Sequence, residues 1–205
     1  MGRLVVDTTA DYRIWAYPGG MRSFLLAIPF LLLACDNKDK ASPPPAPAPS
    51  AATTTTAATA LKEGDAAPDV DMTLQDGKHL KLSSLKGKPV VVYFYPKDET
   101  PGCTVEAQDF KGRFDELKKA DITVVGVSTQ DAASHQAFID KEKLPFSLAV
   151  DEDKSLAKAF GVPVSASGMS ARQTFLIGKD GTVKKIWRDV RPKDHANEVL
   201  AAAQS

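Results

Sequence analysis

The sequence predicts an α/β domain in which helices cover both faces of a central mixed β-sheet. Val90–Tyr95 is apolar throughout, as expected of a strand that is buried on both faces, and Ile122–Val127 is predicted to be a second buried strand. Each is followed by a segment with the apolar spacing of an amphipathic helix. Closer to the C-terminus, two further strand-like segments flank Lys179-Asp180-Gly181, which is a typical hairpin turn. This order indicates parallel strands joined to an antiparallel pair in one sheet.

The first half of the domain should alternate strands with helices. A short strand of alternating polarity precedes the first buried strand. The helix that follows repeats apolar side chains at spacings of three and four, at Ala107, Phe110, Phe114 and Leu117. In order, the predicted elements are His79–Leu82, Val90–Tyr95, Thr104–Lys119, Ile122–Val127 and Asp131–Lys143.

The second half should complete the sheet with a hairpin and close with a helix. That last helix is expected to begin near Pro192, a residue suited to a first helical turn, and to bury Val199 and Leu200. The elements before it are a strand at Ser147–Val150, a helix at Lys154–Phe160 and hairpin strands at Thr174–Ile177 and Val183–Asp189. The whole order fits a thioredoxin-like fold.

Composition excludes several classes of function. The 205 residues carry 26 Lys and Arg against 26 Asp and Glu, and no basic patch alternates with aromatic residues, so we expect no nucleic-acid partner. His79, His135 and His195 are scattered without metal-ligand spacing, and no glycine-rich phosphate loop is present. We therefore predict no metal, no cofactor and no Cys/His pair.

The N-terminal part of the chain has the pattern of a targeting segment. Residues 1–20 contain aspartates and lack the positive charge of a leader, so we expect translation to begin at Met21 and treat residues 1–20 as an upstream extension. Residues 21–34 contain an apolar run that is shorter than the about 20 residues needed to span a bilayer. We interpret residues 21–34 as a signal peptide.

That run ends in Leu32-Leu33-Ala34-Cys35, which resembles the lipobox of bacterial lipoproteins. In that family the cysteine receives a diacylglyceryl group and becomes the mature N-terminus. The resemblance implies a membrane-anchored protein of the bacterial cell envelope that faces the periplasm, on either the inner or the outer membrane. The alternatives are an ordinary signal peptide and a chance apolar run. Residues 35–60, rich in Pro, Ala, Ser and Thr, should form a disordered linker to the domain at 61–205.

Cys103 is the one cysteine in the predicted domain, and it lies just after the first buried strand. Thr100 suits an N-cap and Pro101 a first helical residue, so Cys103 falls at the third helical position. The unpaired amides and the helix dipole there favour a thiolate over a thiol. We interpret Cys103 as a nucleophile.

The segment around Cys103 resembles the peroxiredoxin signature Pro-x-x-x-Thr-x-x-Cys, here Pro96, Thr100 and Cys103. The resemblance implies a thiol-dependent peroxidase that reduces hydrogen peroxide and organic or lipid hydroperoxides through a sulfenic acid, in antioxidant defence. The segments that are similar to the bacterioferritin-comigratory-protein branch, also called the Q type, are Tyr93–Ala107, Ala171–Ile177 and Trp187–Lys193.

The same resemblance implies roles for three further residues. Thr100 binds a peroxide oxygen, Pro96 shields Cys103 from water, and Arg172 holds the thiolate and the peroxide. From the residues alone, Thr100 could simply cap the helix, Pro96 could end the strand, and Arg172 could be a surface charge. We expect Glu106 to be a carboxylate on the helix surface rather than part of the site.

The chain departs from many Q-type relatives at Gln108, where they place a second, resolving cysteine. The resemblance then implies a one-cysteine cycle, in which an external small thiol or thioredoxin-like protein reduces the sulfenic acid of Cys103. We expect a monomer or a weak dimer. The short loop Gly161–Ser170 should lie near the site, either widening access for bulkier hydroperoxides or having no consequence.

Two other functions remain open. A thioredoxin-like disulfide oxidoreductase would need a Cys-x-x-Cys pair, but Thr100 and Glu106 occupy the two positions that could complete it with Cys103. A non-catalytic or peroxide-sensing lipoprotein on the same scaffold would signal by oxidation of Cys103. A sensor stops after one equivalent of peroxide, whereas a peroxidase turns over.

Overall fold

The computed structural model describes residues 60–205. The predicted start at Met21, the signal peptide at 21–34, the lipidation of Cys35 and nearly all of the linker at 35–60 lie outside these residues. Within 60–205, no helix combines the length and the apolar composition needed to cross a bilayer.

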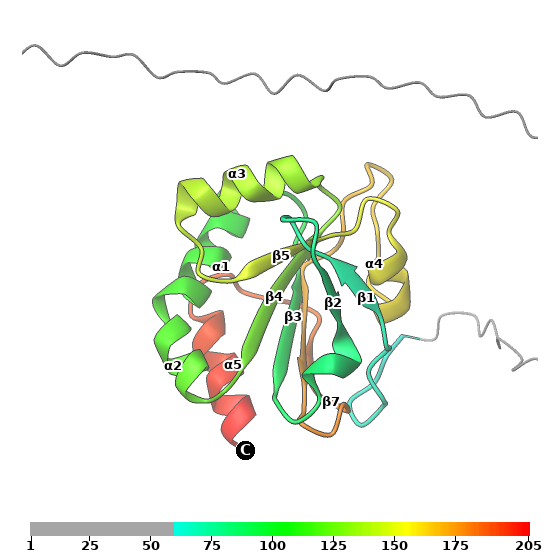
Figure 1. Ribbon diagram of the computed structural model, residues 1–205, viewed down its shortest axis with the longest axis vertical. Coiled ribbons are helices and arrows are strands. Elements are labelled where there is room, and N and C mark those ends of the chain that lie inside the picture. The colour runs from blue at the N-terminus through cyan, green and yellow to red at the C-terminus, as the bar shows by residue number, and fades with distance from the viewer. Residues whose placement is uncertain (1–59) are drawn as a thin grey trace, which may run out of the picture. The chain divides into compact units, whose positions relative to one another are not determined.

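A five-stranded mixed sheet forms the centre of the domain, in the order β5-β4-β3-β6-β7 (Figure 1). The middle strand β3 pairs in parallel with β4 and antiparallel with β6, and the β6–β7 hairpin completes one edge. This arrangement confirms the predicted mixed sheet. Its strands are β3 Val90–Phe94, β4 Thr123–Ser128, β5 Ser147–Val150, β6 Gln173–Ile177 and β7 Val183–Trp187.

Both faces of the sheet are covered, because alternate side chains of β3 enter two separate cores. Val91 and Tyr93 pack under four helices, whereas Val92 and Phe94 pack under one helix and a small hairpin. The first face carries α1 Pro101–Gly112, α2 Phe114–Lys119, α3 Ala132–Glu142 and α5 His195–Gln204 (Figure 1). The second carries α4 Ser155–Phe160, the strands β1 Asp71–Thr73 and β2 His79–Lys81, and the 3₁₀ turn η1 Leu82–Leu85.

Several boundaries differ from the prediction. The single helix predicted at Thr104–Lys119 is two helices, because the backbone leaves helical geometry at Arg113, directly after Gly112, a residue that weakens helices. The closing helix α5 begins at His195 rather than near Pro192, after Asp194 with φ of 67°. The strand predicted at His79–Leu82 is shorter by one residue and pairs with β1 in a separate two-stranded sheet.

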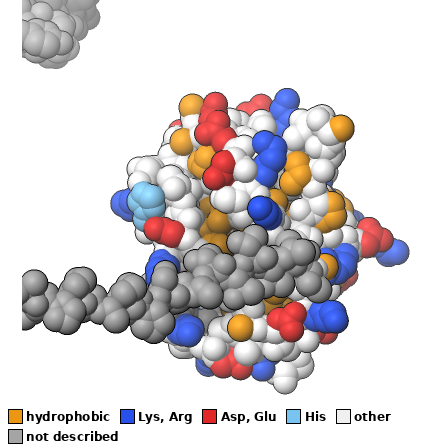
Figure 2. Space-filling model, turned by 90° about the vertical axis from the view of Figure 1, so that its right-hand side faces the viewer, with side chains coloured by type: hydrophobic (Ala, Val, Ile, Leu, Met, Phe, Trp, Pro, Cys, Tyr) orange, Lys and Arg blue, Asp and Glu red, His pale blue; other side chains and the backbone are white. Residues whose placement is uncertain are grey.

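The register of β3 and β6 brings distant parts of the sequence together. Phe94, the last residue of β3, pairs with Gln173, the first residue of β6. The loop that leaves β3 and leads into α1 therefore lies beside Arg172, which immediately precedes β6. On the side shown in Figure 2, acidic and basic side chains are interspersed rather than gathered by sign.

Candidate active site

Cys103 lies where the sequence predicted, at the third residue of α1, and its side chain is buried with 2% of its surface exposed. Thr100 occupies the N-cap position in extended geometry, with φ of −74° and ψ of 148°. Its hydroxyl does not cap the helix but donates to the Lys97 carbonyl at 3.1 Å. Because that hydrogen is used within the loop, the oxygen keeps its lone pairs to accept a hydrogen bond.

Arg172 reaches the sulfur of Cys103, which lies 69 residues earlier in the sequence. Its Nη2 atom donates to Sγ at 3.2 Å. The guanidinium also passes close to Gly102, where a Cβ atom would stand 3.3 Å from Nη2. A cation and the first turn of a helix thus meet at one sulfur, and both stabilise a thiolate.

Glu106 corrects the sequence prediction. We expected a surface carboxylate, but Glu106 is completely buried and forms an ion pair with Nη1 of Arg172. Burial raises the pKa of Glu106 to about 7, although the charge of Arg172 opposes the shift. The pattern that could have revealed it is the helical spacing Cys103, Glu106, Ala107 and Phe110, all of which are buried.

Arg172 remains a cation in this setting. Burial alone would lower the pKa of Arg172, but the charge of Glu106 and the hydrogen bond to Cys103 outweigh burial and raise it. The Glu106 side chain fixes one end of the guanidinium, and the other end faces the sulfur. The group is therefore held in place as a permanent positive charge beside Cys103.

Comparisons with known proteins agree with this geometry. The AhpC/TSA family model matches residues 63–186. Peroxiredoxin Q from chloroplasts of Populus jackii is 46% identical over 147 residues, which cover 71% of this chain and 69% of that protein. The chain belongs to the peroxiredoxin Q/BCP family.

Bacterial peroxiredoxins show the same similarity. Peroxiredoxin Bcp of Bacillus subtilis is 43% identical over 143 residues, covering 67% of this chain and 91% of that protein. A solved structure of the Xanthomonas campestris bacterioferritin comigratory protein superposes with a TM-score of 0.64 at 36% identity, covering 70% of this chain and 96% of that one. The protein is therefore an enzyme with a thioredoxin-like fold, a thiol peroxidase of the thioredoxin-dependent type.

Three further features named from the sequence have defined places in this peroxiredoxin. Pro96 opens the loop after β3 and is half-buried. Gln108, five residues after Cys103, is tied to the end of α3, where its amide donates to the Glu142 carboxylate at 2.6 Å. Ser170, at the end of the loop Gly161–Ser170, donates to the Tyr95 carbonyl at 2.9 Å, so this loop does lie beside the end of β3.

The three histidines of the peroxiredoxin have polar partners other than Cys103 among the described residues. His79 is exposed on β2, while His195 contacts Thr174 at 2.9 Å, and burial lowers the pKa of His195. His135 pairs with Asp98 in a buried contact. Among the described residues, no group of three or more His, Cys, Asp or Glu side chains could hold a metal ion.

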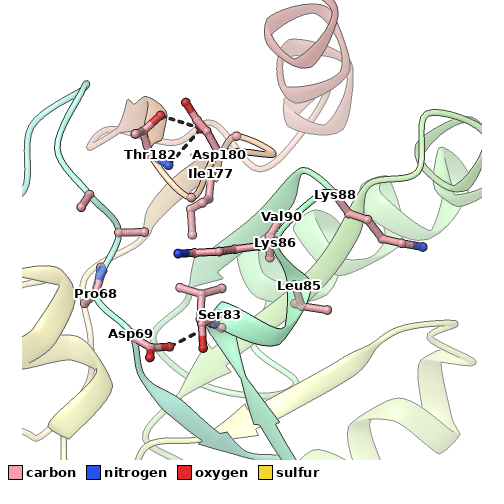
Figure 3. A pocket seen from close by; sticks show the side chains of 15 residues that line it. Pro68, Asp69, Ser83, Leu85, Lys86, Lys88, Val90, Ile177, Asp180 and Thr182 are labelled. Carbon is pink, nitrogen blue, oxygen red and sulfur yellow. Dashed lines mark hydrogen bonds between the residues drawn. The ribbon is translucent and has the colours of Figure 1, made fainter.

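A cavity of about 170 Å³ lies at the other end of β3 (Figure 3). Val90, the first residue of β3, lines it, and the Lys86 side chain extends across it between Ser83 and Ile177. Asp69 also lines the wall, so the cavity mixes a carboxylate with an ammonium group. None of the residues around Cys103 lines this cavity.

Proposed function

We propose that this peroxiredoxin reduces peroxides by a one-cysteine cycle on Cys103. The observation that carries the proposal is the 3.2 Å contact between Arg172 and the Cys103 sulfur at the start of α1. The thiolate sulfur attacks the terminal oxygen of R–O–O–H, so that an S–O bond forms and the O–O bond breaks. Sulfur is oxidised to sulfenic acid, and the departing RO⁻ takes a proton from water to give ROH.

The neighbouring side chains have separate roles in this step. Arg172 stabilises the thiolate and the charge that develops as the O–O bond lengthens. The Thr100 oxygen accepts the hydrogen of the peroxide and orients it for attack. Pro96 shields the sulfur from water. These roles require groups fixed near Sγ, which is what the ion pair with Glu106 and the hydrogen bond to Lys97 supply.

An external thiol completes the cycle. The sequence contains two cysteines, Cys35 and Cys103, and residues 61–205 contain only the second. A thiol R′SH condenses with the sulfenic acid to give a mixed disulfide and water. A second R′SH then attacks that disulfide, releasing R′SSR′ and the Cys103 thiol. The reductant is a small thiol or a thioredoxin-like protein, and the enzyme acts as a monomer or weak dimer.

Turnover tests this cycle. Peroxide consumption with a panel of thiol donors should continue for many equivalents in the native protein and stop in Cys103→Ser. After peroxide treatment with the donor, mass spectrometry should detect a mixed disulfide at Cys103. Consumption of a single equivalent would instead indicate a sensor. A Cys35–Cys103 disulfide in native protein would contradict both the cycle and the lipidation of Cys35.

Organic and lipid hydroperoxides are proposed substrates beside hydrogen peroxide. The Xanthomonas relative is described by its alkyl peroxide reduction activity. In the present chain, Val105 is 46% exposed two residues after Cys103, and among the described residues it is the exposed large apolar side chain. Competition between hydrogen peroxide and an alkyl hydroperoxide for the reduced enzyme tests this preference, with faster oxidation by the alkyl compound expected.

We further propose that the mature protein is anchored in the bacterial cell envelope through Cys35. The support is the sequence Leu32-Leu33-Ala34-Cys35 at the end of the apolar run. Anchoring would concentrate the enzyme beside lipid hydroperoxides. Cys35→Ala should move the protein from the membrane fraction to the soluble fraction, and intact mass should show a lipid-modified N-terminus only in the native chain. A native protein that is soluble with an unmodified Cys35 would overturn the proposal.

A further inference from the structure

Asp98 is a buried carboxylate in the loop that carries Thr100 to the active site. Its neighbours Lys97 and Glu99 are exposed, whereas Asp98 is 5% exposed and points into the protein. A charged side chain is rarely buried unless its charge and hydrogen bonds are fully satisfied. The surroundings of Asp98 meet that condition.

Three side chains donate to the Asp98 carboxylate. The Tyr95 hydroxyl donates to Oδ1 at 2.7 Å. Ser134 Oγ donates to Oδ2 at 2.7 Å, and His135 Nδ1 lies 2.9 Å from the same oxygen. Hydrogen bonding to the charged form lowers the pKa of Asp98, although burial opposes it. Two of the donors belong to the first turn of α3, so Asp98 ties the loop to that helix.

His135 lies between the Asp98 carboxylate and strand β5. It is fully buried, and its second ring nitrogen, Nε2, lies 3.2 Å from the Ala149 carbonyl in β5. Each ring nitrogen of His135 therefore faces an acceptor, the carboxylate at Nδ1 and the carbonyl at Nε2. The buried contact between His135 and Asp98 connects the loop to α3 and β5.

The backbone between the Asp98–His135 contact and Thr100 is held in an unfavourable conformation. Glu99 has φ of 59°, a left-handed value that costs a residue with a Cβ atom free energy unless its surroundings enforce it. On one side of Glu99, Asp98 is clamped, and on the other, Thr100 donates to the Lys97 carbonyl. The clamp thus fixes the peptide that orients the Thr100 hydroxyl.

We propose that Asp98 and His135 are positioning residues for peroxide reduction, and we name the cluster of Tyr95, Asp98, Ser134 and His135 the loop clamp. The hydrogen bonds of the clamp join its members to one another and to β5, and none of those described goes to Cys103. It sets the position of the Thr100 oxygen and so the alignment of the O–O bond with the sulfur. This inference rests on the proposed role of Thr100 in binding peroxide.

Two reactions of Cys103 distinguish a variant that misaligns the peroxide from one that disrupts the active site as a whole. Oxidation by peroxide requires an aligned O–O bond, whereas alkylation by iodoacetamide requires only an accessible thiolate. In the full-length reduced protein, Asp98→Asn should slow peroxide oxidation by about 10- to 100-fold while alkylation stays within about twofold. The matched control is Glu99→Gln, which makes the same charge change one residue further on. Glu99 is 47% exposed and pairs only with exposed Lys141, so both rates should stay native.

A conservative pair of variants tests the histidine. His135→Asn keeps an amide nitrogen near the position of Nδ1 and retains a donor to Asp98, whereas His135→Gln places its nitrogen near Nε2 and loses that donor. Peroxide oxidation should be faster in the Asn variant than in the Gln variant, at equal alkylation rates. If Asp98→Asn does not fold, Ser134→Ala and Tyr95→Phe, which each remove one donor, are judged by the same two rates.

The outcomes are distinct. Native peroxide oxidation in Asp98→Asn, or an equal fall of both rates, overturns the clamp. Thr100→Val serves as the reference for the proposed function. If Thr100→Val slows oxidation and Asp98→Asn does not, the role of Thr100 stands and the clamp is wrong. If Thr100→Val oxidises at the native rate, the role of Thr100 is wrong, and the inference that depends on it falls too.

Discussion

Arg172 donates hydrogen bonds to two groups, the Cys103 sulfur and the Glu106 carboxylate. The Cys103 sulfur receives one hydrogen bond from Nη2, and the Glu106 carboxylate receives another from Nη1. The negative charge of Glu106 reduces the positive field at the sulfur, yet the ion pair fixes the guanidinium in direction. An arginine side chain has many rotamers, so holding it in one of them is a substantial part of preorganisation.

Glu106→Gln should therefore lower peroxidase activity. The glutamine amide can no longer hold Arg172 by charge, and we expect the rate of Cys103 oxidation to fall about tenfold, since truncating a positioning contact near a reacting centre has effects of this order. Stopped-flow oxidation measures it. Glu116→Gln is the control, because Glu116 is 52% exposed on α2 and pairs with exposed Arg113. A native rate in Glu106→Gln would show that Arg172 does not need this partner.

Gly102 permits the close approach of Arg172. A Cβ atom at this position would lie 3.3 Å from Nη2, so Gly102→Ala should displace the guanidinium by a few tenths of an ångström and slow peroxide oxidation several-fold. Gly112→Ala is the matched control in the same helix, because its Cβ would meet nothing within 4 Å. That control should keep native activity and gain up to about 1 kcal/mol of helix stability. Equal activity of both variants would contradict the steric argument.

Elements differed in how far the sequence predicted them. The strand β3 is an apolar run buried on both faces, and β4 is buried along most of its length, so both strands could be predicted from the sequence. The strand β1, which pairs with β2, was not predicted. The helix break at Arg113 was also missed, because the apolar spacing continues across it to Leu117.

The short helix α4 depends on a carboxylate outside its own sequence range. Asp151 is buried, and its two oxygens accept from the amides of Leu156 and Ala157 at 2.8 and 2.9 Å. Asp151→Ala should lower the free energy of unfolding by about 2 kcal/mol, since it leaves two amides without partners. Urea unfolding measures it.

Asp153→Ala is the comparison for that prediction. Asp153 accepts one exposed hydrogen bond, from the Ser155 amide. Asp153→Ala should therefore lower the free energy of unfolding by less than Asp151→Ala does. Because α4 lies on the face of the sheet opposite to α1, the Cys103 oxidation rate should remain native in both variants. A larger fall in the free energy of unfolding in Asp153→Ala than in Asp151→Ala would contradict this account of α4.

At the scale of the whole molecule, the buried Glu106 carboxylate lowers the free energy of unfolding around neutral pH. The folded-state pKa of Glu106, about 7, lies above its ordinary value of 4.5, so the folded protein binds the proton more tightly than the unfolded chain. Stability from this group is fully present below pH 4.5 and is lost as pH rises to 7. At 1.36 kcal/mol for each pKa unit, the loss is at most about 3 kcal/mol.

Glu106→Gln should remove this dependence. The difference in unfolding free energy between the variant and the native protein, measured by urea unfolding at pH 4.5 and at pH 7, should change in favour of the variant as pH rises. Other groups, such as Asp98, titrate alike in both proteins, so their contributions to the unfolding free energy cancel in that difference. A difference that is constant with pH would mean that Glu106 stays ionised in the native protein throughout this range.

The sequence by itself determined the fold class, the family, the position of Cys103 in the first turn of a helix, and the candidate partners Thr100, Pro96 and Arg172. Apolar runs, caps and turn residues act over a few neighbouring residues, so they can be read locally. The resemblance to peroxiredoxins supplied the distant Arg172, which no local pattern could assign.

Tertiary structure alone decided which side chains meet Glu106 and Asp98 in the interior. Both are carboxylates in segments where a surface position is the ordinary expectation. Each is buried beside a partner from elsewhere in the chain: Arg172 for Glu106, and His135 for Asp98. Burial of a charge depends on its partner, and the partner is set by the β3–β6 register and by the packing of α3, which sequence spacing does not encode.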